Sequence, residues 1–194
     1  SNGAPLVQTG TATDDTFITT GANGLLVPGL AQDGAGGFDT LLIKKAALEP
    51  ITDAAFAGLI NFEALRLGAP TFAVDFDVTL GANAAAAFGN AIVMQMAGAQ
   101  GRVDATALTA ATTLNLIGGS ASDDIFGGGG ADTLRGGTGN DSVDGGAGHD
   151  VMFGDIGTDS LTGGLGKDEL TAVSGYDQGV GVEYEDRVLG GSGE

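Results

Sequence analysis

A nine-residue repeat is the feature that most limits how this chain can fold. Residues 118–171 divide into six consecutive nonapeptides, each with Gly at its first position, Asp at its sixth and an apolar residue at its eighth. The register continues less regularly to the end of the chain. A fixed period of this kind indicates stacked repeats, in which each unit buries its apolar residue against its neighbours. The Asp residues in register are Asp123, Asp132, Asp141, Asp150, Asp159, Asp168, Asp177 and Asp186, and the apolar residues of the six regular units are Ile125, Leu134, Val143, Met152, Leu161 and Leu170.

The composition of the 194-residue chain agrees with a repeat architecture. Gly accounts for 37 residues, aromatic side chains for 6%, and Trp and Cys are absent. A core of large interlocking side chains is therefore not expected, and a disulfide framework is excluded. The formal net charge of -18 should attract cations and repel nucleic acid and anionic membranes. No apolar run approaches the roughly 18 residues of a membrane-spanning helix, so membrane insertion is not expected either.

The repeat follows the pattern G-G-x-G-x-D-x-U-x, where U is a large apolar residue, and so resembles the calcium-binding nonapeptides of the RTX family. The resemblance implies a right-handed parallel β-roll, in which six residues form a turn, three form a short strand and two nonapeptides complete a coil. The expected fold is therefore all-β. A β-roll is expected over 118–194, regular over 118–171 and degenerate over 172–194.

The residue types in the repeat suit calcium on chemical grounds as well. Glycines at the first, second and fourth positions permit positive φ and a close approach of backbone carbonyls to an ion, and calcium takes six to eight oxygen ligands. Asp residues that only cap turns are the alternative, but stacked carboxylates about 5 Å apart would repel without a cation. With two nonapeptides per coil, the expected Asp pairs are 123–141, 141–159 and 159–177 on one edge, and 132–150, 150–168 and 168–186 on the other.

The RTX pattern also implies a set of carbonyl ligands. One turn gives its Asp and the carbonyls of its second and fourth positions, and the turn one coil later gives its Asp and those of its first and third positions. Asp155 replaces a second-position Gly, which Asp tolerates in a left-handed conformation, whereas Ala172, Val173 and Val182 replace glycines and weaken the last two sites. Several ions, about four to six, are expected in 118–194. The implied carbonyl donors are Gly119, Ala121, Gly128, Gly130, Gly136, Gly137, Thr138, Gly139, Gly145, Gly146, Ala147, Gly148, Gly154, Ile156, Gly163 and Leu165.

Residues 4–117 are expected to form a less regular β-solenoid with degenerate repeats. The run VDATALTAATTLNLIGGSASDD (103–124) resembles the segments that lead into RTX repeats in bacterial S-layer proteins and large surface adhesins. Isolated echoes of the repeat place Asp15 and Asp39 at sixth positions, without a partner eighteen residues on. Strands are predicted at 60–67, 72–80, 91–96 and 112–117, and short helices at 52–60 and 82–88. Asp75 and Asp77 are interpreted as the solvated face of their strand.

No catalytic constellation is found, and enzyme activity is not expected. The single histidine, His149, lies at the fifth position of a repeat and is interpreted as an exposed turn residue. The periodic carboxylates indicate a metal rather than acid–base catalysis. A solute-binding face with a regular row of Thr is disfavoured, because the third positions form no such row.

Two functions remain open. The first is a calcium-dependent structural module of a secreted surface protein of the S-layer or adhesin type. The second is the RTX folding and export module of a secreted enzyme or toxin whose catalytic domain lies elsewhere. The last five residues open a further unit, so a fragment of a longer protein is expected, and the resemblance implies type I secretion. The expected partners are calcium and either neighbouring copies or cell-surface glycans.

Overall fold

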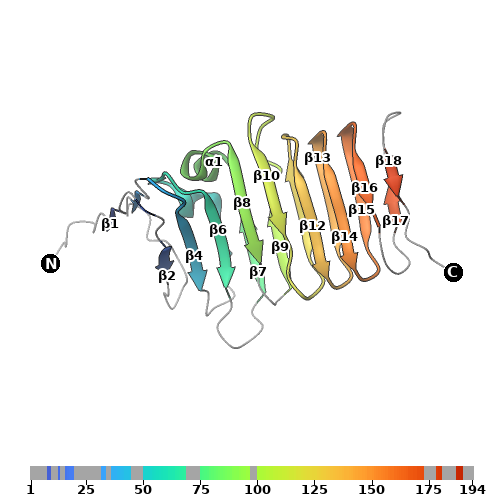
Figure 1. Cartoon of the computed structure of the whole chain (residues 1–194), viewed down its shortest axis with the longest axis horizontal. Coiled ribbons are helices and arrows are strands. Elements are labelled where there is room, and N and C mark those ends of the chain that lie inside the picture. Colours follow the sequence, from blue (N-terminus) through green and yellow to red (C-terminus); the bar gives the residue numbers. More distant parts are fainter. Residues whose placement is uncertain are drawn as a thin grey trace.

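Parallel β-strands, stacked coil upon coil, make up most of the computed structural model (Figure 1). It describes residues 8–9, 13, 16–19, 32–33, 36–44, 50–68, 75–96, 100–172, 178–180 and 187–189. No helix in these ranges is long and apolar enough to cross a membrane. The strands are β1 (Gln8–Thr9), β2 (Thr16–Thr19), β3 (Gln32–Asp33), β4 (Thr40–Lys44), β5 (Leu59–Ile60), β6 (Ala64–Gly68), β7 (Phe76–Thr79), β8 (Ala91–Met96), β9 (Gly101–Asp104), β10 (Thr113–Ile117), β11 (Asp124–Gly128), β12 (Thr133–Thr138), β13 (Ser142–Gly148), β14 (Val151–Ile156), β15 (Ser160–Gly166), β16 (Glu169–Thr171), β17 (Gln178–Val180) and β18 (Arg187–Leu189).

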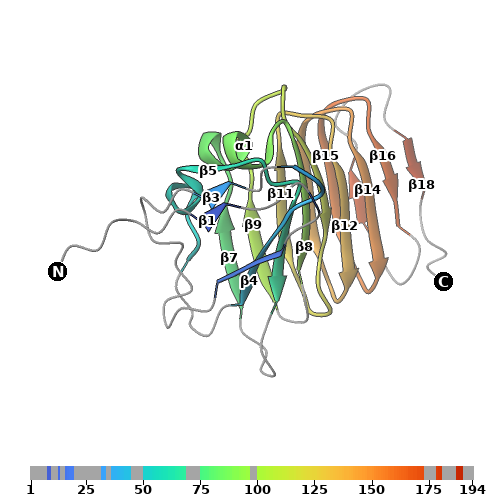
Figure 2. The ribbon, with the colours of Figure 1, turned by 60° about the vertical axis from the view of Figure 1, so that its left-hand side comes forward.

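The strands form two long parallel sheets and one short one. The nine-stranded sheet has the order β18-β16-β14-β12-β10-β8-β6-β4-β2, and the six-stranded sheet has the order β17-β15-β13-β11-β9-β7. From β8 onward the chain enters the two sheets alternately, as a solenoid requires. Figure 2 brings β7, β9 and β11 of the shorter sheet into view beside the longer one. The third sheet contains β1, β3 and β5. The all-β solenoid predicted from the repeat is confirmed.

The strand register confirms that two nonapeptides form one coil of the repeat. Thr133 pairs with Val151 and Ser142 pairs with Ser160, so neighbouring coils are eighteen residues apart in both sheets. The coils before the repeat are longer: Thr40 pairs with Ala64, a spacing of 24. β10 pairs with both β8 and β12, so the nine-stranded sheet runs without interruption from the preceding segment into the repeat.

The interior changes in character along the stack. In the repeat, every eighth-position residue from Ile125 to Leu170 is at most 1% exposed, and it is the one large side chain that each unit buries. The preceding segment buries larger groups, including the four phenylalanines Phe56, Phe62, Phe76 and Phe88. The Phe88 ring lies 5.9 Å from that of Phe56 and 6.1 Å from that of Phe62. The earlier coils therefore bury larger side chains, whereas in the repeat the same core continues with one large apolar residue per unit.

Two short helices cover one side of the earlier coils. The 3-10 helix η1 (Asp53–Phe56) and the α-helix α1 (Ala82–Phe88) are joined by the Asp53 carboxylate. It accepts hydrogen bonds from the backbone N–H groups of Gly81, Asn83 and Ala84 at 2.8–3.1 Å. These are the N–H groups that the first turn of a helix leaves without partners. The Ala-rich α1 was predicted, and a carboxylate from another segment caps its N-terminus.

The other predicted elements are largely confirmed. Strands form within the predicted ranges at 64–67, 76–79, 91–96 and 113–117, and residues 71–74 lie outside the described ranges. The strand predicted over 60–67 is interrupted at 61–63, where Asn61 adopts φ 60. The helix predicted over 52–60 is wrong in its second half. It ends at Phe56 because Gly58 adopts φ 87 and turns the chain into β5.

Two leucines of one strand should differ sharply in their contribution to stability. Leu161 is fully buried in β15, whereas Leu165 on the same strand is 60% exposed. We expect Leu161→Ala to lower the free energy of unfolding by about 2–5 kcal/mol, because it leaves a cavity in the core. Leu165→Ala should change it by about 0.5 kcal/mol or less. Chemical denaturation of both variants at saturating calcium measures the difference, and equal losses would contradict the assigned core.

Candidate metal centre

Six aspartates of the repeat lie inside the solenoid rather than on its surface. Each directly precedes a strand and is only 1–2% exposed. One row lies where the chain enters the six-stranded sheet, and the other lies where it enters the nine-stranded sheet. The first row contains Asp123, Asp141 and Asp159, and the second contains Asp132, Asp150 and Asp168. The structure thus brings together the described members of the pairs that the repeat predicted. Asp177 and Asp186 lie outside the described residues.

One oxygen of each of these carboxylates joins two coils. Oδ1 of Asp141 accepts the backbone N–H of Asp123 at 2.8 Å, and Oδ1 of Asp150 accepts that of Asp132 at 2.8 Å. The same bond recurs one coil later, from Asp141 to Asp159 and from Asp150 to Asp168, both at 2.9 Å. The aspartates therefore do act as caps of the preceding coil, and Asp123 also caps its own turn, because its Oδ2 accepts the N–H of Gly119 at 2.7 Å. The repeat pattern gave no sign of the bonds between coils.

The first carboxylate of each row bonds to the segment that precedes the repeat. Asp123 Oδ1 accepts the N–H of Gly101 at 2.6 Å, and Asp132 Oδ1 accepts the N–H of Leu114 at 2.7 Å. The repeat thus docks onto the earlier coils through these two bonds, the pairing of β9 with β11 and of β10 with β12, and a shared apolar core.

The surroundings of the second carboxylate oxygen, Oδ2, show whether these residues fit a bound cation. In the described structure, Oδ2 of Asp132, Asp141 and Asp150 is buried and has no hydrogen-bond partner. A buried anionic oxygen without a partner is strongly unfavourable. Such a hard oxygen is also the ligand type that calcium prefers. The donor set therefore fits calcium.

Burial makes the charged form of these groups costly. Desolvation raises the pKa of Asp132 to about 7 and the pKa values of Asp141 and Asp150 to about 6. The charges of neighbouring carboxylates raise them further, while the backbone hydrogen bonds act in the opposite direction. Burial also raises the pKa of Asp123. A bound cation would reverse this effect, because its charge favours the ionised carboxylates.

Backbone carbonyls face the same inter-coil space. A methyl group added to Gly137 would overlap the carbonyl oxygen of Gly119, so this second-position carbonyl faces the next coil. The first-position carbonyl of Gly136 faces backward, because a methyl group on Gly118 would overlap it. The same forward direction holds for the carbonyls of Ala121, Gly128, Gly130, Gly139, Gly146 and Gly148, and the same backward direction for those of Gly145, Gly154 and Gly163.

These directions match the ligand set that the RTX resemblance implied. The third-position carbonyl of Ile156 also points backward, since it accepts the N–H of Gly139 at 2.8 Å. A carbonyl has two lone pairs, so such a bond leaves room for an ion. The ligand role of all these carbonyls stays a prediction, and for Gly137, Thr138, Ala147 and Leu165 the direction of the carbonyl is not shown either.

Asp155, which replaces a second-position Gly, adopts the left-handed conformation, as the sequence predicted. It adopts φ 64, in line with the positive φ of the corresponding Gly137, Gly146 and Gly164. Its carboxylate lies 3.0 Å from Nη1 of Arg135, whose guanidinium carbon is 4.1 Å from the centre of the Phe153 ring. Asp155 therefore has a structural role on the outer surface.

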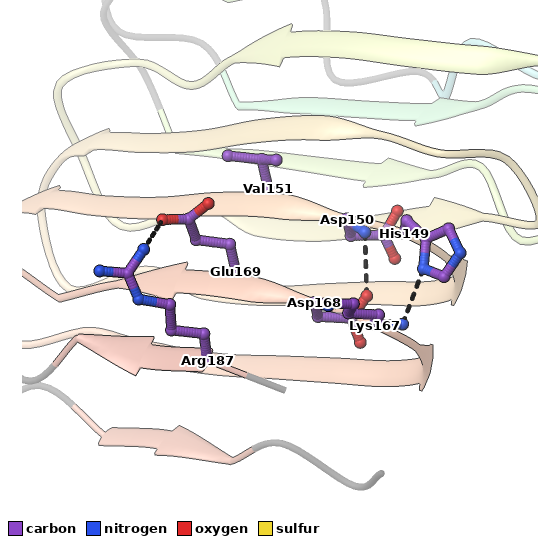
Figure 3. A pocket seen from close by; sticks show the side chains of 7 residues that line it. All are labelled: His149, Asp150, Val151, Lys167, Asp168, Glu169 and Arg187. Atoms are coloured by element: carbon purple, nitrogen blue, oxygen red, sulfur yellow. Dashed lines mark hydrogen bonds and ion pairs between the residues drawn. The ribbon is translucent and has the colours of Figure 1, made fainter. Parts of the chain in front are cut away.

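A second ladder runs along the fifth positions and was not foreseen. The side chain of one coil accepts the backbone N–H of the residue eighteen positions later. His149 Nδ1 accepts the N–H of Lys167 at 2.8 Å, and Asn140 Oδ1 accepts that of Thr158 at 3.0 Å. Figure 3 shows His149 beside Lys167 at a pocket of ≈ 360 Å³ next to Asp150. His149 is the exposed turn residue that the sequence indicated.

Of the two isolated repeat-like motifs near the N-terminus, the structure describes the one that contains Asp39. Asp39 is fully buried, and its N–H donates to Glu63 Oε2 at 2.6 Å. The sequence offered no partner for Asp39 eighteen residues later. The structure gives it one 24 residues later, Glu63, because this coil is longer and Thr40 pairs with Ala64. Asp15 lies outside the described residues. Asp75 is exposed and Asp77 lies 3.7 Å from Arg102, as expected for a solvated face.

No three His, Cys, Asp or Glu side chains gather into a possible metal site within the described ranges. A cation between two coils would therefore take two carboxylates and draw its other ligands from backbone carbonyls. That composition suits calcium, whose sites often include backbone oxygens. It does not suit zinc, which prefers nitrogen and sulfur ligands.

Comparison with known families agrees with this geometry. The model of the RTX calcium-binding nonapeptide repeat, in four copies, matches residues 117–152 and 144–178. No curated protein and no solved structure matches the chain. Residues 117–178 are therefore RTX calcium-binding repeats, as the aspartate spacing predicted.

The raised pKa values predict an unusual pH dependence for the metal-free protein. Between the unfolded pKa near 3.8 and the folded values of about 6–7, the folded state holds more protons than the unfolded state. Stability is then fully present below the unfolded pKa and is lost as the pH rises through about 6–7. Thermal unfolding in calcium-free buffer should show a falling Tm from pH 4 to pH 8. A Tm that rises over this range would contradict the buried, unneutralised carboxylates.

Proposed function

We propose that this chain is a calcium-dependent structural module of a secreted bacterial surface protein, of the S-layer or adhesin type. The observation that carries the proposal is the row of buried carboxylates whose second oxygen, in Asp132, Asp141 and Asp150, has no protein partner in the described structure. Calcium would neutralise these groups and join adjacent turns. Its role is thus in folding and stability, and no catalytic step is assigned to it.

Each ion is proposed to lie between two turns that are one coil apart. For the first pair, the turns of Asp123 and Asp141 would provide the two carboxylates together with carbonyls such as those of Gly119 and Gly136. The same arrangement repeats on both edges, which gives several ions over 118–171. The stacked arrangement makes most aspartates members of two sites, so binding at one site should favour binding at the next.

The earlier coils support a surface module over an export module of an enzyme. Within residues 36–117, β4, β6, β8 and β10 belong to the nine-stranded sheet and β7 and β9 to the six-stranded sheet, so most of their strands continue the two sheets of the repeat. Their last part also resembles the lead-in segments of S-layer proteins and adhesins. Extracellular modules bind calcium with Kd values of about 10⁻⁴–10⁻³ M. Sites of that affinity would fill outside the cell, where the chain is proposed to fold.

Calcium should increase both the order and the stability of the chelator-treated chain. For each site the stabilisation should be about 2.7 kcal/mol at a hundredfold excess over Kd. Circular dichroism and thermal unfolding during a calcium titration measure this. Magnesium should substitute poorly, because it prefers a tighter octahedron and keeps its waters. An unchanged spectrum, or equal stabilisation by magnesium, would contradict the proposal.

Substituting an aspartate shared by two sites should remove more bound calcium ions than substituting an aspartate at the end of a row. Asp141→Ala should abolish two sites, because Asp141 faces a coil on either side, whereas Asp123→Ala should abolish one. Asp124→Ala is the matched control, since Asp124 is the adjacent exposed aspartate of β11. Calorimetric calcium stoichiometry of the three variants gives the count. Equal losses for Asp141→Ala and Asp123→Ala would show that the eighteen-residue pairing does not define the sites.

A further inference from the structure

A groove crosses the outer face of the nine-stranded sheet, on strands that precede the repeat. Its volume is ≈ 380 Å³, and it is lined by residues of β4, β6, β8 and β10 together with Phe38. This is the size of a small-ligand site. None of the proposed calcium ligands lines it, so an inference about the groove stands apart from the proposed function.

Exposed apolar groups form part of the groove wall. Phe38 is 51% exposed, Val93 39% and Ile117 41%. In β8 and β10, Val93 lies directly beside Asn115 and Ile117 directly beside Gln95. Apolar side chains and amides therefore alternate on this surface. Such a mixture suits a ligand that has both apolar faces and hydrogen-bonding groups.

Arg66 gives the groove its charge. It is the one ionisable side chain among the described residues that line the groove. Its Nη2 donates to Oε1 of Gln95 at 2.9 Å, so a neutral amide holds the guanidinium in place. The other described arginines each pair with a carboxylate: Arg102 with Asp104, Arg135 with Asp155 and Arg187 with Glu169.

A positive charge with no carboxylate partner among the described residues stands out in a chain of net charge -18. The guanidinium can bind a carboxylate through two parallel hydrogen bonds, which the amide of Gln95 does not satisfy. The groove therefore complements an anionic group that lies beside an apolar surface.

We propose that this groove binds a carboxylate-bearing sugar, a uronic acid unit of an acidic polysaccharide. The carboxylate pairs with Arg66, the Gln95 and Asn115 amides bond to ring hydroxyls, and the Phe38 ring covers a C–H face of the sugar. A peptide fits less well. Extended peptides bind to sheet edges through backbone hydrogen bonds, whereas the groove lies on interior strands whose backbone groups are already paired with their neighbours.

Titration calorimetry with the full chain at fixed free calcium tests the proposal. The probes are a galacturonic acid trimer and the matched neutral galactose trimer. The acidic trimer should bind at least about tenfold more tightly than the neutral one, the difference expected for a charge-assisted hydrogen bond. Arg66→Gln should weaken it about tenfold or more. Arg135→Gln is the matched control, because its arginine is on the same face but paired, and it should leave affinity unchanged.

A second variant, Asn115→Ala, and a second probe, octanoate, test the sugar contacts separately from the charge. Asn115→Ala removes an exposed amide at the other end of the groove and should weaken the acidic trimer several-fold. Equal binding of the two trimers would overturn the proposal, and so would unchanged affinity in Arg66→Gln. Binding of octanoate without binding of the acidic trimer would also overturn it, by showing that the groove selects an aliphatic carboxylate instead of a sugar.

Discussion

The buried aspartate between two coils is the interaction on which the rest of the structure depends. Its Oδ1 bonds to the backbone of the preceding coil, while its Oδ2 faces a space lined by carbonyls. The first bond fixes the register at eighteen residues. The second oxygen makes the stack unstable unless a cation or a proton neutralises it. The high glycine content follows from the same constraint, because a side chain at Gly118 or Gly137 would collide with a carbonyl of the adjacent coil.

The two parts of the solenoid use different sources of stability. The earlier coils bury phenylalanines and carry two short helices, and their interior is apolar throughout the described ranges apart from groups such as Asp39. The repeat buries one large apolar residue per unit and relies on its charged edges. Between them, Gly101 and Leu114 offer backbone donors to the first carboxylate of each row. The earlier coils thereby present a surface on which the first coil of the repeat can form.

The sequence predicted the repeat well because every ninth residue is constrained by the same contact. The identity of the buried aspartates, the buried eighth positions and the left-handed Asp155 could all be inferred from spacing and residue type. The cross-coil caps and the fifth-position ladder could not, because many residue types accept such bonds and a pattern of letters does not show which atoms face each other. The Asp39–Glu63 contact was missed since a glutamate replaces the expected aspartate and the coil is 24 residues long. A search at spacings other than eighteen would have found Asp15, Asp39 and Glu63 in series.

The central claim is that cations occupy the inter-coil spaces on both edges of the repeat. Anomalous diffraction from crystals grown with calcium tests this most directly, because it locates each ion independently of the protein atoms. The account predicts anomalous peaks between the carboxylates of Asp123 and Asp141, of Asp132 and Asp150, and of each following pair, within about 2.3–2.6 Å of Oδ2. Crystals whose buried carboxylates contact only water or protein, with calcium confined to the outer surface, would contradict it.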